Sequence, residues 1–214
     1  MKRLFELGNP VIQFIIKLFD CMVLSVLWLA FSLPVFTMGA ASTALYATVY
    51  RYLRRGEGYL WKTFWTAFRE NFKRSTLAWL PMLGMLLFLL YDLLALRALI
   101  QNGNPLGRLF GVILVLLLVA AVWAVYLAAY CARFQGGVKD MLRCSFFLMM
   151  AHPLRSLAVM LAVVGSIALI LVVPGLAAML PAVAVWISSI QIEQVFMLHV
   201  KPADMTQANK EEQE

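Results

Sequence analysis

The chain has 214 residues, of which 63% are hydrophobic and 14% are charged, whereas about a quarter of the residues in an average soluble domain are charged. This composition excludes a fold that is surrounded mainly by water. Several apolar runs reach the roughly 20 residues that an α-helix needs to cross about 30 Å of hydrocarbon. They lack the apolar and polar alternation of membrane β-strands. We therefore expect an all-α, polytopic helical membrane protein.

The first membrane span is expected at residues 10–33. Pro10 suits its first turn, where a missing backbone N–H costs nothing, and Pro34 ends it because proline removes a backbone donor and disfavours helix at the preceding residue. No small-residue cleavage site stands out near the N-terminus, so we expect this helix to act as an uncleaved insertion signal.

The second span is expected at residues 36–52, directly after the proline, with Thr37 as its N-terminal cap. Gly39, Thr43 and Ala47 recur at every fourth residue and therefore share one face of this helix. Small residues on one face allow a neighbouring backbone to approach closely. The spacing predicts a helix-packing surface at these three residues.

An amphipathic helix is expected at residues 59–74. Its basic residues face away from an aromatic stripe at helical spacing. The stripe consists of Trp61, Phe64, Trp65, Phe68 and Phe72. Aromatic residues opposite basic ones are typical of a helix that lies in the interface of the anionic cytoplasmic leaflet, so we interpret the stripe as a membrane contact. The alternative is an ordinary amphipathic helix packed on the membrane helices.

Four further spans complete an expected bundle of about six transmembrane helices. They are predicted at about residues 75–97, 108–130, 154–173 and 176–198. Residues 1–202 then form a single integral membrane domain, and the polar tail at residues 203–214 is expected to be a disordered cytoplasmic segment.

The distribution of Lys and Arg predicts the orientation. The segments expected inside hold two such residues at the N-terminus, seven from Arg51 to Arg74, four from Arg133 to Arg155 and two in the tail, whereas the outer loops hold only Arg97 and Arg108. Basic residues concentrate on the cytoplasmic side of membrane proteins. We therefore expect both termini in the cytoplasm, and the net charge of +7 indicates a membrane rather than a nucleic-acid partner.

The segment "LSVLWLAFSLPVFTMGAASTALYATVYRYLRRGEGYLWKTFWTAFRENFKRS" resembles the YesL-like family of uncharacterised bacterial integral membrane proteins. The proline followed by Thr-x-Gly, the small-residue helix, the basic stop and the "F..F..NF" helix carry the likeness, and "YCARFQGGVKDMLRCSFFLMMAHP" is similar to an inner loop of that family. The resemblance implies a multi-pass protein of a Gram-positive plasma membrane, associated with carbohydrate uptake and polysaccharide utilisation. It implies no established reaction.

No pattern of catalytic or metal-binding residues is found in the sequence, so we expect neither an enzyme nor a cofactor or metal site. The three cysteines, Cys21, Cys131 and Cys144, show no CxxC spacing and are interpreted as packing residues. The two histidines, His152 and His199, lie at the ends of predicted spans, where a structural, solvated role is expected.

Charged residues within the spans form a candidate intramembrane polar site at Lys17, Asp20 and Glu193, because charges in hydrocarbon are costly and usually face a bundle interior or a cavity. Lys17 and Asp20 share one face of the first span. One interpretation is a cavity for a solute or a coupling proton. The other is structural: Lys17 and Asp20 pair with each other, and Glu193 reaches basic residues at the interface.

Two functions follow as hypotheses. The first is a non-enzymatic accessory or scaffold protein beside a carbohydrate ABC transporter or a sensor kinase. The second is a transporter or permease subunit for a small solute such as an oligosaccharide. The inner loop "FQGGVKDMLRCSFFLMMAHP" has a glycine but lacks the Glu-Ala-Ala start that an ATP-driven importer permease shows, which weakens the second hypothesis.

Overall fold

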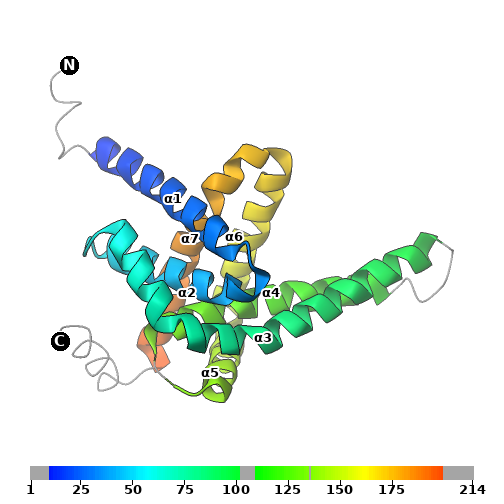
Figure 1. Ribbon diagram of the computed structural model, residues 1–214. Coiled ribbons are helices and arrows are strands. Elements are labelled where there is room, and N and C mark those ends of the chain that lie inside the picture. The colour runs from blue at the N-terminus through cyan, green and yellow to red at the C-terminus, as the bar shows by residue number, and fades with distance from the viewer. Residues whose placement is uncertain (1–9, 102–108, 135, 200–214) are drawn as a thin grey trace.

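The computed structural model describes residues 10–101, 109–134 and 136–199 of the chain, and the tail expected to be disordered lies outside them. In this part all regular elements are helical (Figure 1). The α-helices are α1 (Pro10–Ser32), α2 (Met38–Thr48), α3 (Leu60–Gln101), α4 (Phe110–Arg133), α5 (Val138–Ala151), α6 (Pro153–Val172) and α7 (Leu180–His199). Short 3₁₀ segments at Val35–Thr37 and Pro174–Ala178 and a π-helical segment at Val49–Arg54 connect some of them.

Four of these helices, α1, α3, α4 and α6, are long and apolar enough to cross a membrane by length and composition. The apolar helix at Leu180–Phe196 is shorter than that criterion. Helix α2 has 11 residues and is about 16 Å long at 1.5 Å per residue, roughly half the thickness of the hydrocarbon core. The described chain is thus an all-α protein with four candidate membrane spans.

The junction between α1 and α2 is held by Thr37, although not through a capping bond. Its hydroxyl makes no capping bond to α2 and lies 2.7 Å from the backbone oxygens of both Phe31 and Pro34. The last carbonyl groups of a helix lack partners within the helix. Thr37 therefore stands at the N-cap position of α2, as expected, but its hydroxyl satisfies one acceptor at the end of α1 and one in the following turn instead of forming the capping bond.

Helix α2 lies in the centre of the bundle, and most of its residues are fully buried. Gly39 is placed directly against α3: a Cβ atom added there would lie 2.6 Å from Cγ of Trp79 and 3.1 Å from the backbone oxygen of Ser75. The hydroxyl of Thr43 donates to the carbonyl of Gly39 at 2.9 Å, and Ala47 is buried. Of the three small residues, Gly39 is therefore the one at which α3 approaches the backbone of α2 closely.

Helix α3 joins two segments that the sequence analysis separated. The amphipathic helix expected at 59–74 and the span expected at 75–97 form one helix of 42 residues, about 63 Å long at 1.5 Å per residue. Pro81 lies inside it, and Figure 1 shows α3 changing direction along its length. The expected span at 75–97 already contained Pro81, which a long helix can accommodate by a bend. The boundary expected between residues 74 and 75 is absent, because the backbone stays helical from Leu60 to Gln101.

The first part of α3 packs part of its aromatic stripe on α1. The ring of Phe31 lies 5.7 Å from that of Phe64 and 5.0 Å from that of Phe68, and both phenylalanines of α3 are buried. Trp61, Trp65 and Phe72 are exposed. Phe64 and Phe68 therefore pack against a neighbouring helix, as in the alternative interpretation of this segment. The side chains of Trp61, Trp65 and Phe72 remain at the surface, where a membrane interface can contact them.

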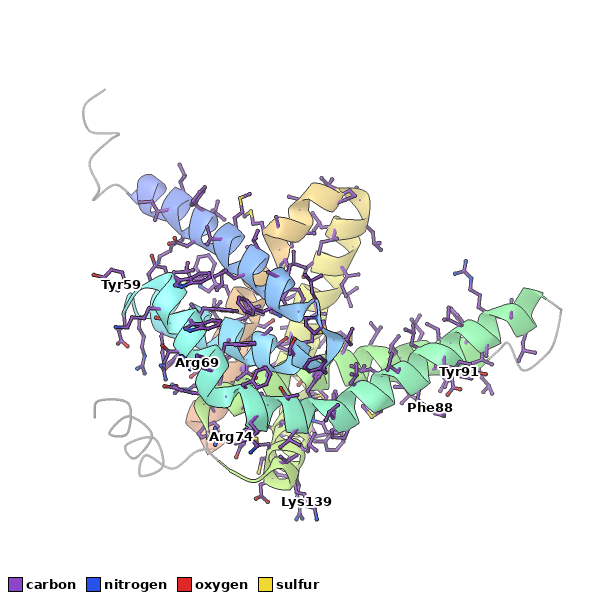
Figure 2. All side chains as sticks on the ribbon, viewed as in Figure 1. Tyr59, Arg69, Arg74, Phe88, Tyr91 and Lys139 are labelled. Atoms are coloured by element: carbon purple, nitrogen blue, oxygen red, sulfur yellow. The ribbon has the colours of Figure 1, made fainter. Side chains whose placement is uncertain are left out.

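The second half of α3 and the first half of α4 project together from the other helices (Figure 1). Large apolar side chains are exposed along this arm, including Leu87, Tyr91 and Val115, and Figure 2 shows Phe88 and Tyr91 pointing outwards. Apolar exposure on this scale is unfavourable in water but costs nothing in hydrocarbon. The arm therefore agrees with a protein surrounded by lipid.

We expect Gly39→Ala to lower the free energy of unfolding by about 2 kcal/mol, because the added methyl group would overlap Trp79. Gly84→Ala is the matched control, since a Cβ atom there meets nothing within 4 Å and alanine favours helix over glycine. Thermal unfolding in mild detergent measures both. Equal melting temperatures for Gly39→Ala and the wild type would show that α2 and α3 are not closely packed.

Candidate functional site

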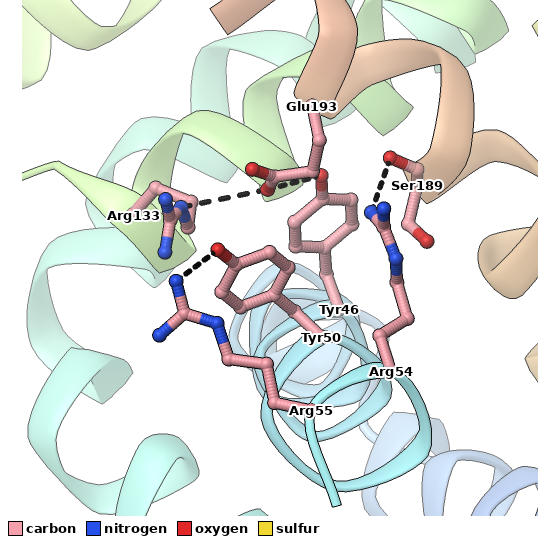
Figure 3. Close-up of polar contacts among 7 residues, drawn as sticks. All are labelled: Tyr46, Tyr50, Arg54, Arg55, Arg133, Ser189 and Glu193. Carbon is pink, nitrogen blue, oxygen red and sulfur yellow. Dashed lines mark hydrogen bonds and ion pairs between the residues drawn. The ribbon is translucent and has the colours of Figure 1, made fainter. Parts of the chain in front are cut away.

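Glu193 of α7 is the buried carboxylate of the described chain, with 5% of its surface exposed. The hydroxyl of Tyr46, on α2, donates to its Oε1 atom at 3.0 Å. The Nε atom of Arg133, the last residue of α4, lies 3.4 Å from the same oxygen. Three helices thus converge on one carboxylate (Figure 3).

The position of α2 explains why these groups meet. Tyr46 is fully buried in the centre of the bundle, and Tyr50 and Arg54 follow it at intervals of four residues. This spacing carries Arg54 along the same side towards α7, where its Nη1 atom donates to the backbone oxygen of Ser189 at 3.0 Å. Two successive contacts, from Tyr46 and from Arg54, therefore hold α2 and the following π-helical segment against α7.

This arrangement stabilises a carboxylate within a bundle of low polarity. A buried charge is costly when it stands alone, and removal of one member of a buried ion pair is strongly destabilising because its partner is left uncompensated. Among the described residues, no group of three or more His, Cys, Asp or Glu side chains could hold a metal ion. The hydrogen bond from Tyr46 and the ion pair with Arg133 connect α2, α4 and α7 at Glu193, and we call these three residues the polar joint.

Lys17 and Asp20 lie apart from Glu193, on α1. Together with Tyr52 they line a cavity of about 260 Å³, which is also bordered by Ile16, Leu53 and Gly56. The side chain of Asp20 is hydrogen-bonded to that of Tyr52, and the Nζ atom of Lys17 lies 6.0 Å from the ring centre of Trp186 on α7.

These contacts correct the expected pairing of Lys17 with Asp20. No ion pair between the two is found in the part of the chain that the structure describes. The π-helical segment brings Tyr52 to Asp20, and α7 brings Trp186 to Lys17, so each side chain meets a different aromatic partner. The three residues of the predicted polar site therefore divide between a polar cavity at α1 and a buried joint at α7.

The structural interpretation expected Glu193 to reach basic residues, but the sequence did not identify which residues are its partners. Tyr46 and Arg133 were not singled out, because neither is unusual in its own segment. The interval of four residues from Tyr46 to Tyr50 and Arg54 is a signal that the sequence contains, since it places polar tips on one side of an otherwise apolar helix. The position of Arg133 opposite that side follows only from the packing of α4 on α2.

Residues 21–93 match the model of a family described as "Protein of unknown function, DUF624". The matched region runs from α1 through α2 and into the arm of α3, and it includes Gly39, Trp79 and Tyr46. Arg133 and Glu193 lie beyond it. No curated protein and no solved structure matches the chain.

A double-mutant cycle measures the coupling of Arg133 to Glu193. We expect Glu193→Gln and Arg133→Gln each to lower the free energy of unfolding by about 3 kcal/mol, because each strands the other charge. The double variant should recover at least about 1 kcal/mol relative to the sum of the single losses. Chemical denaturation in detergent is the measurement, with the exposed Arg69→Gln as the control for loss of an arginine; strictly additive losses would contradict the pair.

Proposed function

We propose that this protein is a non-enzymatic accessory or scaffold component of a membrane assembly for carbohydrate uptake or polysaccharide utilisation. The pairing of Glu193 with Arg133 and Tyr46 is the observation that favours an accessory protein over a transporter, and the carbohydrate context rests on the resemblance to the YesL-like family. A carboxylate that binds a transported solute or proton must exchange partners during transport. Glu193 instead has an opposite charge and a hydroxyl donor from two other helices, as a structural charge requires.

We also propose that the chain crosses the plasma membrane of a Gram-positive bacterium six times, with both termini in the cytoplasm. The excess of Lys and Arg in the segments assigned to the inside supports this orientation. The four long apolar helices support a membrane protein, and the resemblance to the YesL-like family is the basis for proposing a bacterial plasma membrane. The second and sixth crossings would use α2 with its flanking segments and α7.

The basic inner segments are the proposed docking surface for a carbohydrate ABC transporter or a sensor kinase. Arg69 and Lys73 on α3, and Lys139 and Arg143 on α5, are all exposed. Figure 2 shows Arg69 and Lys139 pointing away from the bundle. Charged side chains at such surfaces contribute to the rate and specificity of association with an acidic partner.

The alternative function is a transporter or permease subunit for a small solute such as an oligosaccharide. The cavity at α1 favours it, because its volume of about 260 Å³ is lined by Lys17, Asp20 and Tyr52. A few convergent polar groups in a concave site are typical of small-molecule binding sites. An ammonium, a carboxylate and a phenol together supply donors and acceptors for a polyhydroxylated solute.

Cysteine labelling in intact cells tests the orientation. Asn102→Cys, at a position outside the described residues, should react with a membrane-impermeant maleimide, and Glu57→Cys should react only after permeabilisation. Glu57 is preferable to its neighbour Gly56, whose φ of 73° disfavours a side chain. The wild-type protein, with its three native cysteines, gives the background. The reverse labelling pattern would contradict both termini being cytoplasmic.

Uptake measurements separate the two functions. We expect cells that lack this protein to take up less labelled oligosaccharide, and Asp20→Asn to restore uptake as fully as the wild type, because an accessory protein needs no solute-binding carboxylate. Purified protein in liposomes should transport none. Uptake by the liposomes that Asp20→Asn abolishes, while the variant keeps its wild-type melting temperature, would establish the transporter instead.

A further inference from the structure

Tyr50 lies near the start of the π-helical segment. The guanidinium groups of Arg54, Arg55 and Arg133 gather around its ring (Figure 3). The central carbon of Arg133 lies 4.1 Å from the ring centre, that of Arg55 lies 4.6 Å from it and that of Arg54 lies 5.8 Å from it. Each of these distances is within the range of a cation–π contact. The ring therefore holds arginines from two separate segments close to one another.

The positive charge of this cluster is only partly compensated. Arg54 donates to a backbone oxygen, that of Ser189, and Arg133 is paired with Glu193. Three guanidinium groups and one carboxylate leave an excess of two positive charges. Guanidinium groups gathered around one ring repel one another, and an anion bound among them reduces this repulsion.

The donors of the cluster are also available. The Nη2 atom of Arg55 donates to the hydroxyl of Tyr50 at 2.6 Å, so that hydroxyl acts as an acceptor and keeps its own O–H as a donor. Arg55 is exposed, and the Arg133 side chain is 14% exposed. Each guanidinium carries five N–H donors in a planar fork, of which these contacts occupy a minority. An incoming anion can therefore reach donors from both arginines and from the tyrosine.

We propose that Tyr50, Arg55 and Arg133 form a binding site for a phosphate group, carried either by an anionic lipid headgroup or by a soluble phosphorylated compound. Arginine forks match the oxygen atoms of phosphate with two parallel hydrogen bonds, and such charge-assisted bonds are stronger than neutral ones. Basic pockets between membrane helices on the cytoplasmic side bind lipid headgroups in this way. The site requires neither the scaffold nor the transporter function.

Thermal unfolding of the full-length protein in uncharged detergent tests the site with two probes, inorganic phosphate and dioctanoyl phosphatidic acid. We expect at least one probe to raise the melting temperature by about 5 °C at roughly a hundredfold excess over its Kd. Sodium chloride at the same ionic strength and dioctanoyl phosphatidylcholine are the comparators. A full shift with inorganic phosphate indicates that the phosphate group alone suffices, and a shift with phosphatidic acid alone indicates a lipid headgroup.

Variants assign the shift to these residues. Arg55→Gln should raise the Kd of the active probe at least about tenfold, because it removes a charge-assisted bond, and Arg97→Gln, at an exposed arginine of α3, should leave it unchanged. Tyr50→Phe, which removes one hydroxyl and no charge, should weaken binding to a lesser degree and also serves if Arg55→Gln fails to fold. The site is overturned if neither probe exceeds its comparator, or if binding persists unchanged in the folded Arg55 or Tyr50 variant.

Discussion

The contact between Gly39 and Trp79 fixes the position of α2 in the centre of the bundle. No larger side chain fits there without movement of α3, since the space that a Cβ atom would occupy is already taken by the indole. The indole Nε1 atom in turn donates to the backbone oxygen of Val35 at 3.2 Å, which ties α3 to the turn before α2. Close approach of backbones replaces the hydrophobic driving force that is missing between helices in lipid.

The central position of α2 determines where polar side chains can meet. Tyr46 reaches Glu193 from the buried part of this helix, and the π-helical segment that follows presents Tyr52 to Asp20. Ser25 also joins α1 to the start of α7: its hydroxyl donates to the backbone oxygen of Met179, just before α7, and accepts from the backbone N–H of Ala182, each at 3.0 Å. An unpaired polar group within a membrane is costly. The polar groups of the bundle therefore stabilise the same packing that the small residues permit.

The two proposals concern different sides of Arg133. Its Nε atom faces Glu193 and belongs to the joint between helices, whereas the proposed phosphate site uses the remaining donors of the same guanidinium beside Tyr50 and Arg55. Occupation of the site by an anion would compensate charge that the joint leaves in excess. A bound phosphate would in this way stabilise the contact between α2, α4 and α7.

The sequence by itself determined the helical class, four of the candidate spans, the end of α1 before Pro34 and the small face of α2, because these depend on local properties: apolar length, proline chemistry and residue spacing. It also located Glu193 as a costly charge. Only the tertiary structure decided that the helices expected at 59–74 and 75–97 are continuous in α3, that Asp20 meets Tyr52 rather than Lys17, and that Arg133 is the basic residue that compensates Glu193. These contacts depend on which helices become neighbours, because residues that are distant in the sequence come into contact only when the helices pack together.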